Sequence, residues 1–174
     1  NKVVLIKTKD TETRVTGFEN ITEAENLALA GEDVPVGQYA REIFTNLDIM
    51  DQVEAMEINE GKNVTEVLAA VTQGSNEVGV VYATDAASVA DQVEIIAEAS
   101  SDMLETPVLY PVGMIEDEEA LPEEKVAAET FFEYLQTENA LKVFEEHGFS
   151  PYTAEVEEND TEEAEDTQAD QKTD

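Results

Sequence analysis

The sequence predicts an α/β layered domain with a mostly parallel sheet. Two short, continuous apolar runs, residues 3–6 and 78–82, are typical of strands that are covered on both faces. Between such runs lie segments with apolar residues at helical spacing, as in residues 38–47. Strands that alternate with helices over short loops are typical of a sheet covered by helices. With 174 residues, 41% of them hydrophobic, the chain is long enough for one such domain and part of another.

The first part of the chain supplies the elements up to the second predicted strand. In chain order we expect a strand at 3–6, a short helix at 18–25, a short apolar segment at 26–30, a helix at 38–47, a strand at 55–58 and a polar loop at 59–62. The apolar segment ends at the turn cluster Gly31-Glu32-Asp33.

The second part begins with a helix from Val64, whose apolar residues again repeat at helical spacing. Further elements are expected as strands at 78–82 and 93–97, an extended stretch at 107–115, and helices at 122–135 and 138–147. Pro122 suits the first position of a helix, and Gly148 suits the position just after a helix end.

The charge excludes several classes of partner. The 42 acidic and 9 basic residues give a net charge of −33. This charge excludes nucleic acids and anionic membranes as partners of the surface, because both require basic patches. The chain has no apolar run of about 18 residues that could span a bilayer. It has no Cys, which excludes disulfides and Cys-ligated zinc and fits an extracellular protein. The acidic residues of the folded part would form a solvated surface, which suits high salt or an alkaline exterior.

Residues 153–174 form an acidic tail. They contain ten acids and one Lys with few apolar residues, so we expect them to be disordered.

The sequence offers little from which to build an enzyme, a cofactor site or a cation site. His147 is the only His, and it stands in the last turn of an expected helix, where a partial positive charge is favourable. No Cys or activated Ser accompanies it, and the common nucleotide, nucleophile and calcium-loop motifs are missing. We therefore expect no enzymatic activity, no cofactor and no metal ligands.

Two loop-to-helix junctions stand out instead. Residues 34–37 precede one expected helix and residues 61–64 precede another. Helix N-termini present unpaired N–H groups and suit anions, and in open α/β sheets such loops gather at the carboxyl ends of the strands. Tyr82 ends the apolar strand 78–82, which would place its hydroxyl near the same rim. Every α/β protein has such helix ends, however, so the pattern alone leaves packing as the alternative.

At these residues the chain resembles the periplasmic molybdate-binding proteins, the solute-binding components of molybdate and tungstate ABC importers. The matching stretches are Gly31-Glu32-Asp33-Val34-Pro35-Val36-Gly37-Gln38-Tyr39-Ala40, Asn63-Val64, Gly79-Val80-Val81-Tyr82-Ala83-Thr84-Asp85-Ala86, Leu109-Tyr110-Pro111-Val112, Phe131-Phe132-Glu133-Tyr134-Leu135 and Gly148-Phe149. The resemblance covers residues 1–152. It implies a type II periplasmic-binding-protein-like fold with a three-layer lobe.

The resemblance also implies the ligand contacts. The oxyanion would be bound by the backbone N–H groups of Val36 and Val64 and by the hydroxyl of Tyr82. Val36 replaces an Ala of the family pattern, which a backbone donor tolerates, although the larger side chain could narrow the pocket. The family's two Ser-containing loops have no counterpart in this chain, so the resemblance implies a fragment that lacks the N-terminal part of the first lobe.

The domain organisation follows from the same resemblance. Residues 1–109 would form the second lobe with a hinge strand at its start, and residues 110–152 the returning segment of the first lobe. The chain would cross between lobes near residues 3–8 and 110–112. The helices of the returning segment carry apolar residues that the absent lobe would cover, so the fragment alone is expected either to pair with another copy or to leave this region mobile.

The expected function is to bind molybdate or tungstate and deliver it to an ABC importer permease. The resemblance places the protein outside the cytoplasmic membrane, in an extracellular or periplasmic location, with a lipid anchor in residues that precede Asn1. Two other functions stay open: binding of another oxyanion such as sulfate, and service as the effector-sensing domain of a transcription regulator. The sequence does not rank molybdate against tungstate.

Overall fold

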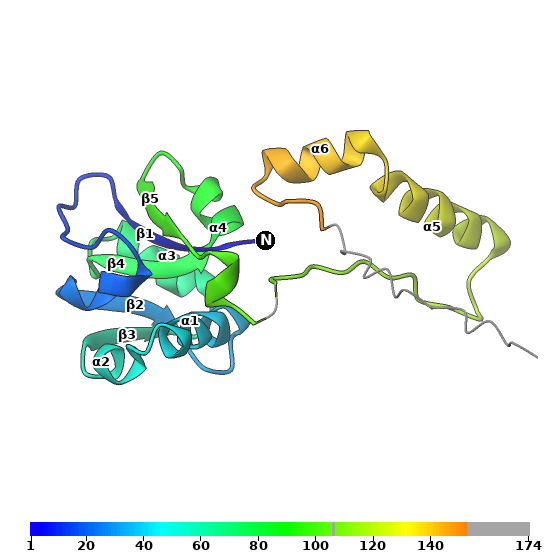
Figure 1. Ribbon diagram of the computed structural model, residues 1–174. Helices are drawn as coiled ribbons and strands as arrows, with labels where there is room; N and C mark the ends of the chain where they lie inside the picture. The colour runs from blue at the N-terminus through cyan, green and yellow to red at the C-terminus, as the bar shows by residue number, and fades with distance from the viewer. Residues whose placement is uncertain (106, 153–174) are drawn as a thin grey trace, which may run out of the picture.

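A five-stranded sheet is the centre of the computed structural model, which describes residues 1–105 and 107–152 (Figure 1). The strand order is β3-β2-β4-β1-β5. In chain order the strands are β1 (Val3–Thr8), β2 (Asn26–Ala30), β3 (Glu57–Gly61), β4 (Val78–Tyr82) and β5 (Val93–Glu98). The expected disordered tail lies outside the described residues.

The sheet is mixed, which corrects the expectation of a mostly parallel sheet. Strand β2 pairs in parallel with both β3 and β4, whereas β1 is antiparallel to β4 and to β5. Val3 lies opposite Tyr82 in this register, and Leu5 lies opposite Val80. Strand direction is decided by pairing between segments far apart in the chain, and apolar composition alone does not reveal it.

Helices cover both faces of the sheet. The helices that follow β1 to β5 are η1 (Phe18–Glu23), α1 (Pro35–Asn46), α2 (Met50–Glu54), α3 (Val64–Thr72), α4 (Ala83–Ser88) and η2 (Ser101–Met103). The connection from β2 to β3 and that from β3 to β4 run in opposite directions across the sheet, so right-handed crossovers place α1 and α3 on opposite faces. All residues of β4 are buried as a result. The expected three-layer α/β lobe is confirmed.

Several local expectations need correction. Strand β3 runs over residues 57–61, so the expected strand at 55–58 is displaced and the expected loop at 59–62 is largely strand. This strand lies at the sheet edge and leaves most of its side chains exposed, which is why its sequence is polar. The segment at 18–25 is a 3-10 helix, α1 begins at Pro35, three residues before the expected start, and the short helices α2 and α4 were not expected.

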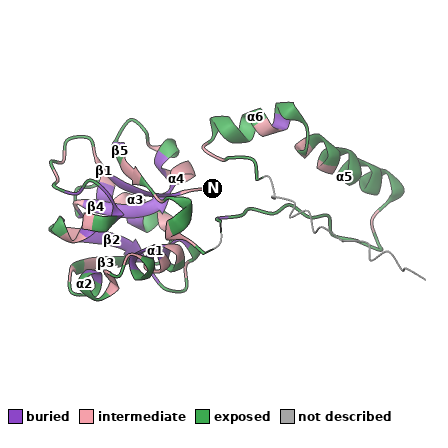
Figure 2. Ribbon diagram, in the orientation of Figure 1, coloured by how far each residue is buried: buried purple, intermediate pink, exposed green. Residues whose placement is uncertain are grey.

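Two helices follow the sheet: α5 (Pro122–Leu135) and α6 (Glu138–Glu146). Pro122 occupies the first turn of α5, and Gly148 has a positive φ of 88° after the end of α6, so both expected helix boundaries are confirmed. Residues 107–115 contain no helix or strand. Helix α5 has no buried residue and α6 has one, Ala140, and both helices extend away from the sheet (Figure 2). Within residues 1–105 and 107–152, no helix combines the length and the apolarity that a membrane crossing requires.

Candidate functional site

The three candidate binding residues follow three neighbouring parallel strands. Val36 comes after β2, Val64 comes after β3, and Tyr82 is the last residue of β4. Because β2 lies between β3 and β4 and is parallel to both, the carboxyl ends of these strands share one edge of the sheet. The Gly31 N–H donates to the Gly61 carbonyl over 2.9 Å, which joins the ends of β2 and β3 directly. The structure therefore brings all three residues to the same edge, as expected.

Val36 lies in the first turn of α1. The N-cap residue, Val34, has no side chain that could satisfy the first N–H groups, and Pro35 has no N–H. Among the described residues, no oxygen accepts a hydrogen bond from the Val36 N–H. The Val36 side chain is fully buried, with 0% exposure, and belongs to the core.

Gly37 allows α1 to begin close to the end of β2. A β-carbon at this position would lie 2.3 Å from the Gly31 carbonyl oxygen and 2.4 Å from that of Ala30. Backbone atoms on both sides cannot turn aside, so only glycine fits here.

Arg41 fastens the same turn. Its Nη1 donates to the carbonyl oxygens of Ala30, at 2.8 Å, and Gly37, at 3.0 Å. Its Nη2 lies 3.2 Å from a carboxylate oxygen of Glu60, and its Nε lies 3.7 Å from one of Glu32. The guanidinium thus joins β2, β3 and α1 and offsets two of the carboxylates that stand near the candidate anion site.

Val64 is the first residue of α3. The Asn63 side chain caps this helix by accepting from the Glu66 N–H over 2.9 Å. A Glu66 carboxylate oxygen accepts from the Lys62 N–H over 2.8 Å. Among the described residues, the Val64 N–H has no such acceptor. It is available to a ligand, although the Glu66 carboxylate adds negative charge to the same helix end.

Tyr82 ends β4 and is the N-cap residue of α4. Its side chain is only 8% exposed, and its ring packs edge-on against Tyr110 with 6.1 Å between the ring centroids. Burial raises the pKa of the Tyr82 phenol well above its usual value, and Tyr110 and Tyr39 raise the pKa further. The hydroxyl therefore keeps its proton over the whole physiological range and can serve as a hydrogen-bond donor.

Asp85 lies one turn after Tyr82, in α4. Burial raises the pKa of its carboxyl. One carboxyl oxygen, Oδ2, is buried and has no hydrogen-bond partner among the described residues. Ionisation of the Asp85 carboxyl, which lies close to Tyr82 in the chain, therefore carries a desolvation cost.

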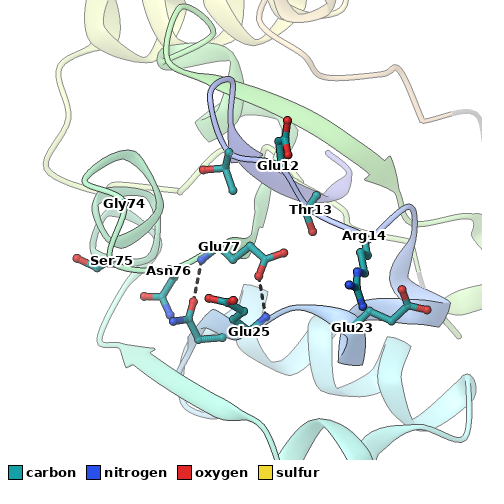
Figure 3. A pocket seen from close by; sticks show the side chains of 11 residues that line it. Glu12, Thr13, Arg14, Glu23, Glu25, Gly74, Ser75, Asn76 and Glu77 are labelled. Atoms are coloured by element: carbon teal, nitrogen blue, oxygen red, sulfur yellow. Dashed lines mark hydrogen bonds between the residues drawn. The ribbon is translucent and has the colours of Figure 1, made fainter.

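A polar hollow of about 680 Å³ lies at the opposite end of the sheet, where β2 and β4 begin (Figure 3). It is lined by Glu12, Glu23, Glu25 and Glu77, with Arg14 as its single basic residue. Glu77 accepts from the Glu25 N–H over 2.7 Å, so part of this lining holds the loops together. The carboxylates make this hollow unsuitable for an anion. In residues 1–105 and 107–152, no group of His, Asp or Glu side chains is arranged to hold a metal ion.

His147 lies at the end of α6, as expected. Its Nδ1 is 2.8 Å from the Val143 carbonyl oxygen, and its ring is exposed. His147 is the C-cap residue of α6. Within the described residues, no hydrogen bond joins its side chain to a candidate nucleophile.

Three residues near the site were missed by sequence reasoning. Arg41 carried a possible signal, since it is one of only 9 basic residues and stands one helical turn after Gly37. Tyr39 and Tyr110 lie in stretches that match the family, but their proximity to Tyr82 arises only when α1 and the segment after residue 107 reach the same end of the sheet.

Comparison with known proteins identifies the family. The family described as bacterial extracellular solute-binding protein matches residues 1–150. In Bacillus subtilis (strain 168), the protein named "Putative ABC transporter substrate-binding lipoprotein YvgL" is 41% identical over 151 residues, which cover 86% of this chain and 55% of that protein. The molybdate-binding protein ModA of Haemophilus influenzae is 36% identical over 117 residues, or 67% of this chain and 43% of that protein.

A solved structure is similar as well. The "substrate binding domain of putative molybdenum ABC transporter from Clostridium difficile" is 31% identical, with a TM-score of 0.74 over 88% of this chain and 64% of that one. The chain thus spans about half the length of the curated relatives that it matches. Its fold is of the periplasmic-binding-protein type. The family match over residues 1–150 and the 41% identity together show that the chain belongs to the bacterial extracellular solute-binding proteins.

Proposed function

We propose that this chain is the ligand-binding lobe of a protein that binds molybdate or tungstate and delivers it to an ABC importer permease. The observation that carries the proposal is that three groups lie at the same end of the sheet: the N–H groups of Val36 and Val64, which have no acceptor among the described residues, and the buried phenol of Tyr82. The relatives named for molybdate or molybdenum support this choice of ligand.

Neutral donors suit such a ligand even on a protein of charge −33. Each hydrogen bond to a charged group contributes about 1.5–3 kcal/mol, so a shell of several donors binds an oxyanion tightly after the cost of association. A site made only of donors also disfavours protonated phosphate, whose O–H would meet another donor. Surface charges further than about 8–10 Å away are screened at ordinary ionic strength.

We also propose that residues 1–109 form one lobe and that residues 110–152 return to a second lobe. The Asn1 amino group donates to the Val108 carbonyl over 3.0 Å, and the Ala83 N–H donates to the Lys2 carbonyl over 2.9 Å. These bonds tie residues 1–2 to Val108 and to the start of α4, next to Tyr82, which supports crossing points of the chain in this part of the molecule. A hinge at these points would close the lobes over the ligand without disturbing β2, β3 or β4.

The proposed protein acts by binding and release, and its partners are the oxyanion and the membrane permease. A lipid anchor outside the cytoplasmic membrane is part of the proposal, supported by the extracellular family and by a relative named as a lipoprotein. No residue of the site needs to exchange a proton or form a covalent bond.

Calorimetric titration of the full-length protein tests the proposal. We expect binding of molybdate or tungstate at least about a hundredfold tighter than that of sulfate or phosphate, since the pocket must fit the longer metal–oxygen bonds. Tighter binding of sulfate would assign the site to that anion. Absence of binding by all four anions would refute an oxyanion function.

A further inference from the structure

Arg41 binds both ends of the turn that carries the candidate donor Val36. The Arg41 side chain is only 18% exposed. Its Nη1 donates to two carbonyl oxygens at once, that of Ala30 over 2.8 Å and that of Gly37 over 3.0 Å. Ala30 is the last residue of β2, and Gly37 directly follows Val36 in α1. A single planar group therefore joins the end of the strand to the first turn of the helix.

The same turn gathers negative charge. Glu32 and Asp33 lie within it, and Glu60 lies beside it in β3. A β-carbon at Gly31 would lie 2.9 Å from Oδ1 of Asp33 and 3.4 Å from Oε1 of Glu60, so these two carboxylates meet at the turn. Nη2 of Arg41 lies 3.2 Å from Glu60, and its Nε lies 3.7 Å from Glu32. An anion bound at this turn would stand near three carboxylates, whose repulsion one guanidinium partly offsets.

We propose that Arg41 is a positioning residue for the oxyanion site, which fixes the turn that presents the Val36 N–H and reduces the repulsion between the carboxylates of the turn and the anion. This inference rests on the proposed function. Arg41 donates to protein carbonyls and carboxylates, and it acts on the anion only through the turn. A guanidinium can do both because its donors are spread over a rigid fork: Nη1 binds the carbonyls while Nη2 and Nε face the carboxylates.

The two effects of Arg41 differ in their response to salt. The geometry of the turn depends on short hydrogen bonds, which salt changes little. The repulsion is a longer-range charge effect, and the screening length falls from about 30 Å at 0.01 M salt to about 3 Å at 1 M. A loss of affinity that comes from charge should therefore shrink at high salt, and one that comes from geometry should persist.

Calorimetric titration of the full-length protein with molybdate, in 0.01 M and in 1 M sodium chloride, tests the inference. Arg41→Lys keeps the charge and loses the fork, so we expect it to weaken binding about three- to tenfold at both salt concentrations. Arg41→Gln also loses the charge. Its binding should be weakened about thirtyfold at low salt, and at high salt its loss should fall to about that of Arg41→Lys.

Lys9→Gln is the matched control, since it also removes one positive charge from an exposed side chain of the same sheet. Lys9 follows β1, which is antiparallel to β4, so Lys9 lies at the end of the sheet away from Tyr82. The affinity of Lys9→Gln should stay within about twofold of the wild type. Every titration is run below the unfolding midpoint of the variant, measured by circular dichroism, so that unfolding does not imitate a loss of binding.

Glu60→Gln adds a test in which the sign of the effect separates charge from structure. This change breaks the ion pair with Arg41, leaves the guanidinium bound to the two carbonyls and removes one negative charge from the turn. We expect molybdate binding to become about two- to fivefold tighter at low salt and to match the wild type at high salt. Weaker binding by Glu60→Gln would overturn the inference, because the pair would then matter only as a structural contact.

The remaining outcomes separate the inference from the proposed function. Affinities of Arg41→Lys and Arg41→Gln within twofold of the wild type, which itself binds molybdate, would overturn the role of Arg41 alone. A loss in Arg41→Gln that is the same at both salt concentrations would also overturn it, since neutralisation of the carboxylates would then have no part. A wild-type protein that does not bind molybdate or tungstate would instead refute the proposed function, and this inference with it.

Discussion

Replacing Gly37 by Ala tests the close approach on which the candidate site is built. The added β-carbon would lie 2.3 Å from the Gly31 carbonyl oxygen and 2.4 Å from that of Ala30. Ordinary contacts of this kind are about 3.5 Å, so the first turn of α1 must retreat from β2 by about 1 Å. This retreat would move the Val36 N–H as well and disturb the bonds of Arg41 to the Ala30 and Gly37 carbonyls.

Two effects of opposite sign decide the stability of this variant. Ala is favoured over Gly within a helix by about 1 kcal/mol. Overpacking costs about 1–3 kcal/mol, and the upper end applies here because both opposing groups are backbone. We therefore expect a net loss of about 2 kcal/mol in the free energy of unfolding.

Urea unfolding of the chain of residues 1–174 measures this loss directly. The midpoint should fall by about 1 M without a change in the m-value. Gly113→Ala is the matched control, since a β-carbon there meets nothing within 4 Å, and its stability should stay within about 0.5 kcal/mol of the wild type. In the full-length protein, Gly37→Ala should also weaken molybdate binding by about tenfold or more. A Gly37→Ala variant as stable as the wild type, or more stable, would refute the argument.

Three further predictions concern the site and the two helices. Val36→Ala should leave oxyanion affinity nearly unchanged but should cost about 1.5–3 kcal/mol of stability, because the Val36 side chain is buried. Val36→Pro removes the N–H donor and should weaken binding more than about tenfold. Equal affinities of the two variants would contradict the assignment of Val36 as a donor. Because burial raises the pKa of Asp85 above its usual 3.8, its contribution to stability is present below that value and lost as the pH rises through the folded pKa. The stability of Asp85→Asn relative to the wild type, followed by urea unfolding, should therefore increase between about pH 3 and pH 7, and a constant difference would argue against a buried carboxylate. Finally, residues 1–174 alone should either self-associate through α5 and α6, whose Val126, Phe131 and Val143 are exposed, or leave these helices mobile. Light scattering that shows a monomer, together with strong hydrogen-exchange protection of residues 122–147, would contradict this.

The sequence alone determined the elements whose signals are local. Strands β1 and β4 were predicted correctly because each is a continuous apolar run, buried on both faces. The boundaries of α5 and α6 were predicted from Pro122 and Gly148, since proline and a glycine with positive φ act on their own turn of chain. The family resemblance named Val36, Val64 and Tyr82 as donors, and this assignment stays a prediction.

The tertiary structure decided what depends on contacts between distant segments. The antiparallel direction of β1 follows from its pairing with β4 and β5. The polar strand β3 is held by backbone bonds to β2 although residues 59–61 were expected to form a loop. The neighbourhood of Tyr82 and Tyr110 likewise joins residues that the chain keeps far apart. Side-chain periodicity reports only whether a segment is buried. Which partner buries it is settled by packing and hydrogen bonding over the whole fold, and these place the three candidate residues at one end of the sheet.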